Sequence, residues 1–181
     1  MKNALGQNVA FFSELASGRF LIVGVELPRG GPAISEDVVC FRAYRAQGDR
    51  FTFVATSEFL HSSDPNNDAL TSLQAQRLPA PTLEREAWFL AWAMVPPRSP
   101  YTVAMRLLAF DGETFRTLWA PKDVVSTSVA DTVSVLPSGL TVNALFAADG
   151  NAAHATELLH QQYLLTIDGP QQIAEWRTPN R

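Results

Sequence analysis

The sequence predicts an all-β fold made of antiparallel meanders, with one or two short helices. Residues 88–95 are apolar at every position, and residues 101–107 alternate between two faces. A short apolar run that stops at two prolines is typical of a strand buried on both sides, and alternation is typical of a strand buried on one. Gly48, Gly112 and Gly169 lie in short turns between apolar segments, where hairpins need positive φ angles.

The first third of the chain is expected to hold one meander. Residues 2–16 fit either a short amphipathic helix or a first strand through 9–12. Clearer strands follow at 20–27, 38–46 and 51–56, with the loop PRGGP after the first and a turn at Gly48 before the last. Two glycines and two prolines exclude regular structure from that loop.

The middle of the chain is expected to form a second meander with strands at 88–95, 101–107 and 115–119. Asp111 and Gly112 supply its tight turn. Residues 67–78 are predicted to form a short helix, because leucine and arginine side chains recur there at helical spacing. Residues 121–129 are expected to be irregular or a helical turn.

The last third is expected to form a third meander, with strands at 140–147, 158–167 and 173–176 and a turn at Asp168-Gly169. The meanders match one another when the sequence is shifted. Moving residue 42 onto residue 106 aligns Arg42, Gly48 and Phe51 with Arg106, Gly112 and Phe115, and moving residue 111 onto residue 168 aligns Trp119 with Trp176. We therefore expect one β-rich domain, 1–181, with repeat units at 17–60, 85–121 and 132–178.

In turn spacing and aromatic content the units loosely resemble the blades of a β-propeller, in which each four-stranded meander packs on the next. The resemblance covers about two thirds of the chain and includes no specific blade signature. Three blades are too few to close a ring within one chain. A β-sandwich or barrel explains the same periodicity and stays open as the alternative.

Composition and charge limit the classes of partner. The net charge is −4 with a pI near 5.3, and only Lys2 and Lys122 among the 14 basic residues are lysines. The scattered arginines form no basic stripe, so we expect no nucleic-acid partner. No apolar run reaches transmembrane length. The expected compartment is the cytoplasm if Met1 is the native start, and lies outside the cytoplasm if a leader has been removed.

The motifs of common enzymes are missing from the sequence. It holds no Gly-rich phosphate loop, no GxSxG elbow and no HExxH pair. The histidines His154 and His160 are six places apart, which does not suit a metal pair on a helix or on a strand. We expect no cofactor, no metal site and no catalytic residue, and we take His61 and Asp64 in a polar loop as binding candidates.

Aromatic and arginine side chains supply the other candidates. Trp119 and Trp176 each end a strand shortly before a proline, where the rim of a sheet meets solvent or a partner. Arg42 and Arg106 are repeat equivalents that could present guanidinium groups to a partner.

Two functions of different class follow. The first is a non-enzymatic, β-rich protein-interaction module, such as an accessory or structural subunit of a larger assembly. The second is a small-molecule or carbohydrate-binding domain, or a hydrolase whose site assembles from distant residues. Because proteins cover or blunt the edges of their sheets and lysine is nearly absent here, we expect a protein partner or self-association, with a two-fold symmetric dimer first.

Overall fold

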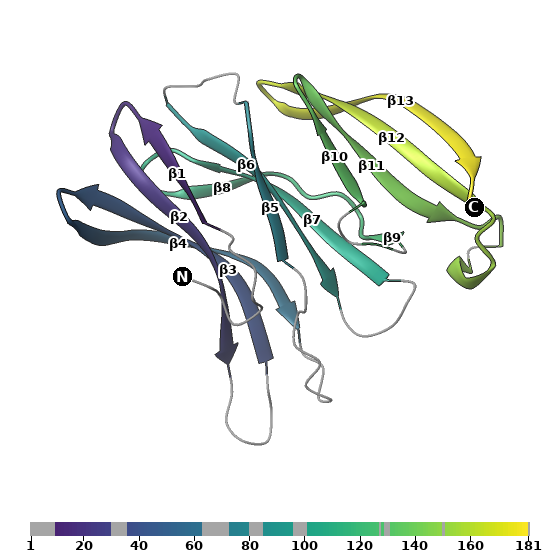
Figure 1. Ribbon diagram of the computed structural model, residues 1–181, viewed down its shortest axis with the longest axis horizontal. Coiled ribbons are helices and arrows are strands. Elements are labelled where there is room, and N and C mark those ends of the chain that lie inside the picture. The colour runs from purple at the N-terminus through teal and green to yellow at the C-terminus, as the bar shows by residue number, and fades with distance from the viewer. Residues whose placement is uncertain are drawn as a thin grey trace.

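The computed structural model describes residues 10–29, 36–62, 73–79, 85–95, 101–126, 128, 131–149 and 151–180. Most of these residues lie in antiparallel strands, and consecutive strands are neighbours in each of three sheets. The predicted all-β fold of antiparallel meanders is confirmed. Figure 1 shows the N-terminal, central and C-terminal sheets side by side.

The N-terminal sheet has the order β1-β2-β3-β4. Its strands are β1 (Ala10–Leu15), β2 (Gly18–Arg29), β3 (Glu36–Gln47) and β4 (Arg50–Ser62). In β1 Ser13 and Leu15 are buried whereas Phe12 and Glu14 are exposed, which is the period of two of a strand. The strand alternative for this segment is correct, and the helix alternative is wrong for residues 10–15.

The central sheet has the order β5-β6-β7-β8, and a further short strand, β9, also pairs with β7. The strands are β5 (Leu73–Leu78), β6 (Ala87–Val95), β7 (Tyr101–Phe110), β8 (Phe115–Trp119) and β9 (Val124–Ser126). Strands β6, β7 and β8 are the meander predicted for the middle of the chain. Strand β9 lies in the segment that was expected to be irregular or a helical turn.

The helix predicted over 67–78 is wrong for residues 73–78, which form β5 and pair with β6. Leu73 and Leu78 are both buried, and they belong to cores on opposite faces of the sheet. Five places along a strand put two side chains on opposite faces, so tertiary packing overrides the helical spacing. The rest of that predicted helix lies outside the described residues.

The C-terminal sheet has the order β10-β11-β12-β13. Its strands are β10 (Val133–Leu136), β11 (Gly139–Phe146), β12 (Glu157–Thr166) and β13 (Gly169–Pro179). The last three agree with the predicted strands and with the turn at Asp168-Gly169, whereas β10 is an additional strand that the sequence analysis does not predict. The single helical segment among the described residues is a 3-10 turn, Ala152–His154, capped by the side chain of Asn151. Within the same residues, no helix has the length and apolarity needed to cross a membrane.

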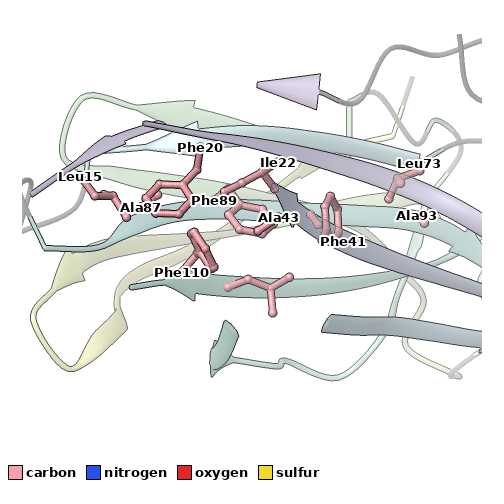
Figure 2. Packing of buried hydrophobic residues seen from close by; sticks show 12 residues of the cluster. Leu15, Phe20, Ile22, Phe41, Ala43, Leu73, Ala87, Phe89, Ala93 and Phe110 are labelled. Atoms are coloured by element: carbon pink, nitrogen blue, oxygen red, sulfur yellow. The ribbon is translucent and has the colours of Figure 1, made fainter. Parts of the chain in front are cut away.

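The core between the N-terminal and central sheets is rich in phenylalanine (Figure 2). Phe41 of β3 meets Phe89 of β6 edge to face with ring centroids 4.9 Å apart, and Phe20 of β2 meets Phe110 of β7 in the same way at 5.1 Å. Edge-to-face pairs add about 0.5–1.5 kcal/mol each to the free energy of burial. This contact therefore holds the two sheets face to face.

The opposite face of the central sheet packs on the C-terminal sheet. Leu90 and Leu107 of the central sheet share a second core with Leu140 and Val142 of β11. Strand β6 is thus covered on both faces, as its unbroken apolar run predicts. The sheets form a stack with the central sheet in the middle, while the resemblance to propeller blades and the division into repeat units stay predictions.

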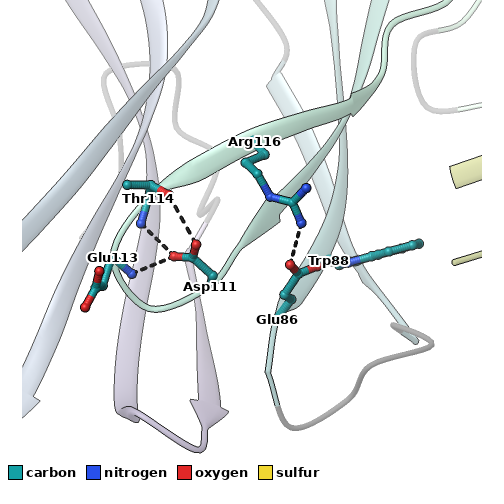
Figure 3. Close-up of polar contacts among 6 residues, drawn as sticks. All are labelled: Glu86, Trp88, Asp111, Glu113, Thr114 and Arg116. Carbon is teal, nitrogen blue, oxygen red and sulfur yellow. Dashed lines mark hydrogen bonds and ion pairs between the residues drawn. The ribbon is translucent and has the colours of Figure 1, made fainter. Parts of the chain in front are cut away.

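The turn after β7 is held by one carboxylate (Figure 3). Asp111 Oδ1 accepts hydrogen bonds of 2.8 Å from the backbone N–H groups of Glu113 and Thr114, and Oδ2 accepts one of 3.2 Å from the Thr114 hydroxyl. Gly112 has a φ of 99°, and a Cβ placed there would lie 2.2 Å from Ser17 Oγ in the β1–β2 turn. The turn therefore needs glycine for its backbone angle and for its contact with the N-terminal sheet.

Candidate interaction surfaces

The outer face of the N-terminal sheet, which points away from the central sheet, is apolar. Alternate residues of β2 (Phe20 and Ile22) point into the core, so Leu21, Val23 and Val25 point outward. Outward aromatic side chains from the other strands remain largely exposed: Phe12 at 46%, Phe51 at 49% and Phe53 at 55%. Clusters of large exposed apolar side chains mark interaction sites in soluble proteins.

This outer face is hollowed into an open groove of about 430 Å³, lined by Leu21, Val23, Val25, Arg42, Tyr44 and Phe51. The Phe12 and Phe51 rings approach to 6.3 Å, although two strands separate β1 from β4. Such an approach requires the sheet to curl around the groove. Among the described side chains, Arg42 is the one charged member of the lining and has no ion-pair partner.

The outer face of the C-terminal sheet carries a polar row beside exposed apolar side chains. His160 of β12 stacks on Trp176 of β13 with ring centroids 5.1 Å apart and an angle of 13° between the planes. Its Nδ1 lies 2.8 Å from Asn143 Oδ1, and its Nε2 lies 2.7 Å from Thr178 Oγ1. Both ring nitrogens are therefore hydrogen-bonded, and the imidazole is held against the indole.

Trp176, a candidate from the sequence, is thus on an outer face, but Trp119 is not. Trp119 lies between the central and C-terminal sheets, where its ring meets that of Tyr163 at 5.0 Å. A cavity of about 210 Å³ adjoins this pair, with Lys122 and Gln161 in its wall. Burial, and then the charge of nearby Glu175, raises the pKa of the Tyr163 hydroxyl. The protonated hydroxyl donates a hydrogen bond of 3.3 Å to Gln161 Oε1.

The two candidate arginines are also separated. Arg106 of β7 lies on the face of the central sheet that packs on the N-terminal sheet, and its Nη1 donates a 2.7 Å hydrogen bond to the carbonyl of Met105. Arg42 lies on the outer face described above. The structure does not bring Arg42, Arg106, Trp119 and Trp176 together into one site.

The loop candidates fall at the edge of the described residues. His61 was expected in a loop, which is wrong: it belongs to β4, and its backbone is opposite Val38 of β3. Asp64 lies outside the described residues. Within the residues that are described, no group of three or more histidine, cysteine, aspartate or glutamate side chains could hold a metal ion.

A second polar cluster lies near the Asp111 turn, where the strand ends of the central sheet meet the β1–β2 turn of the N-terminal sheet. Glu86 accepts a hydrogen bond of 3.0 Å from the buried Trp88 Nε1 and forms an ion pair with Arg116 (Figure 3). An open cavity of about 390 Å³ adjoins Glu86, Asp111 and Glu113. Each contact of Glu86 serves the packing of the central sheet, so we interpret this cluster as structural.

The aromatic outer face was missed in the sequence as a candidate site. Phe12, Phe51, Phe53 and Tyr44 are strand residues in an apolar pattern, and such residues are more often core than surface. Only the stacking order of the sheets leaves this particular face uncovered by any described residue. The His160 and Trp176 stack could have been found from the antiparallel register, which makes the two residues direct cross-strand partners.

Comparison with known proteins does not assign this β-rich stack to a family. No family model matches the chain, no curated protein matches it, and no solved structure matches it.

Proposed function

We propose that the chain is a non-enzymatic protein-interaction module that binds a protein partner through an end of its stack of sheets. One observation carries this proposal: Phe12, Phe51 and Phe53 are about half exposed around an apolar groove on the outer face of the N-terminal sheet. Aromatic side chains and arginine are the residues most enriched at the energetic centres of interfaces. The groove combines both, since Arg42 lies among aromatic and aliphatic side chains.

The groove suits a protein better than a small polar substrate. It is open, and apolar side chains make up most of its lining. Small-molecule sites are usually enclosed and have several converging polar groups. A sheet face of this kind instead buries a flat or convex apolar surface of another protein.

The proposal can be tested by crosslinking in an extract of the source cells, followed by mass spectrometry. Wild-type protein should be crosslinked, through the N-terminal sheet, to a defined protein or to another copy of itself. The double variant Phe51→Glu, Phe53→Glu should lose these crosslinks, because burying two carboxylates without partners is unfavourable. Gln76→Glu, which adds a charge to an exposed residue of β5, is the control and should behave as wild type. Equal crosslinking of the double variant would refute the proposal.

A second candidate function is carbohydrate binding at the outer face of the C-terminal sheet. Trp176 is 42% exposed there, next to the amide of Asn143 and the hydroxyl of Thr178. Aromatic rings beside polar groups are suited to sugars, whose faces are apolar and whose edges carry hydroxyls. Binding on a glycan array that is lost in Trp176→Ala, but kept in the Phe51→Glu, Phe53→Glu variant, would favour this candidate.

A further inference from the structure

The exposed large apolar side chains are unevenly distributed over the stack. Among the described residues, none of them belongs to the central sheet. All belong to the N-terminal sheet or to the C-terminal sheet and its last turn: Phe12, Phe51, Phe53, Leu164, Ile167, Ile173 and Trp176. The two sheets at the ends of the stack are therefore the ones that still offer apolar surface.

The outer face of the N-terminal sheet resembles, in its side chains, the face of the central sheet that the N-terminal sheet covers. Arg42 lies in the third strand of its sheet and Arg106 in the third strand of the central sheet, and both point in the same direction along the stack. Phe51 and Phe115, in the two fourth strands, share that direction as well. Phe115 packs against Phe89 and Phe110 in the core beneath the N-terminal sheet, whereas Phe51 is exposed.

The outer face of the C-terminal sheet resembles, in its side chains, the other face of the central sheet, which the C-terminal sheet covers. Trp119 and Trp176, in the fourth strands of the central and C-terminal sheets, both point away from the N-terminal sheet. Leu107 and Leu164, in the third strands, share that direction. Leu107 is fully buried against the C-terminal sheet, but Leu164 is 39% exposed. Within the described residues, each end of the stack thus lacks the neighbour that its pattern has inside the stack.

The polar row on the C-terminal face does not oppose burial. His160 has both ring nitrogens in hydrogen bonds with Asn143 and Thr178 of the same sheet. Burying a polar group is costly chiefly when its hydrogen bonds with water are not replaced. This row can therefore be covered by an apolar surface with no imidazole nitrogen left unpaired.

We propose that the outer face of the N-terminal sheet packs on the outer face of the C-terminal sheet of a second copy of this chain. This inference rests on the proposed function and names its partner. Contact between two different faces is head-to-tail, and such contacts close into a ring when the rotation between copies permits it. A ring of two copies requires the three sheets of each copy to fan apart, as the blades of a propeller do, so that both outer faces of one copy meet the other copy. Such a ring covers both ends of both stacks, with Trp176 of one copy facing the groove that contains Arg42 of the other. An arginine over an indole face is a favourable contact.

The test is size-exclusion chromatography with light scattering at micromolar concentration. The wild type should have twice the chain mass of 19.8 kDa. Phe53→Glu and Trp176→Glu should each have the monomer mass, because either substitution places a carboxylate in both contacts of the ring. Gln76→Glu should remain dimeric, and far-ultraviolet circular dichroism should be unchanged in all three variants, since Phe53, Gln76 and Trp176 are exposed in the isolated chain.

Mixing the two monomeric variants distinguishes this arrangement from others. A heterodimer of Phe53→Glu and Trp176→Glu retains one intact contact, so the mixture should form a dimer that neither variant forms alone. Persistence of the dimer in Trp176→Glu would mean that the outer face of the C-terminal sheet is not part of the contact and would overturn the inference. Persistence of the dimer in Phe53→Glu would mean that the outer face of the N-terminal sheet is not part of the contact, and would also overturn the inference.

A wild-type chain that stays at 19.8 kDa would also overturn it. The crosslinking experiment then decides the fate of the proposed function separately. If the wild type is a monomer and is crosslinked to a different protein, and the Phe51→Glu, Phe53→Glu variant loses that crosslink, the proposed function is supported and only self-association is refuted. A monomer without such a partner refutes both.

Discussion

Gly112 shows how a single residue joins two sheets. Its φ of 99° is strained for any residue with a Cβ, and its neighbour Ser17 belongs to another sheet. We expect Gly112→Val to lower the free energy of unfolding by more than about 1 kcal/mol, measured from urea denaturation curves. Gly48→Val is the matched control: its φ is also positive, at 59°, but no atom lies within 4 Å of the added Cβ. Equal losses in both variants would mean that contact between the turns contributes nothing.

Asp111, the residue before Gly112, makes the stability of the same turn depend on pH. Burial alone would raise the pKa of its carboxyl, but hydrogen bonds from the backbone of Thr114 and Glu113 and from the Thr114 hydroxyl outweigh burial and lower this pKa. A lowered pKa contributes stability above the unfolded value of about 3.9, and this contribution is lost as the pH falls through the lower folded value.

We therefore expect Asp111→Ala to have a lower melting temperature than the wild type at pH 7, with the difference shrinking as the pH falls below about 3.9. Melting curves followed by circular dichroism across this range provide the measurement. Thr156→Ala, at an exposed residue outside any strand, is a control that should show no such pH dependence. A deficit in Asp111→Ala that is the same at every pH would show that the carboxylate charge is irrelevant.

At the scale of elements, β6 is the strand on which both cores depend. Phe89 is fully buried and contacts Phe11, Phe41 and Phe115 in the core beneath the N-terminal sheet. We expect Phe89→Ala to cost about 3–5 kcal/mol of unfolding free energy, from lost burial and the cavity that remains. Ile167→Ala, at a turn residue that is 67% exposed, should change it by less than about 0.5 kcal/mol. Chemical denaturation of both variants decides whether this core carries the stability that its burial implies.

At the scale of the whole molecule, each outer sheet shares a continuous core with the central sheet. Units that share a core unfold together, so we expect one cooperative transition. Tryptophan fluorescence, which reports mainly on the central and C-terminal sheets, should give the same urea midpoint as circular dichroism, which reports on all strands. Two separate midpoints would instead mean that the sheets are independent domains.

Much of the secondary structure could be predicted from the sequence, because strand periodicity and turn chemistry are local. The apolar run 88–95, the Asp111-Gly112 turn and the strands β11, β12 and β13 could all be predicted from spacing. The strand at 73–78 could not be predicted, because its leucines fit a helix as well as a strand and only the pairing with β6 selects the strand.

Which side chains are available to a partner depends on how the sheets stack. Arg42 aligns with Arg106, and Trp119 with Trp176, in the repeats predicted from the sequence. One residue of each pair lies between sheets and the other on an outer face. The physical reason is that a residue's position in a strand selects its face, whereas the presence of a neighbouring sheet decides whether that face is buried. The stacking order of the sheets, which depends on contacts between distant parts of the chain, therefore defines the candidate site.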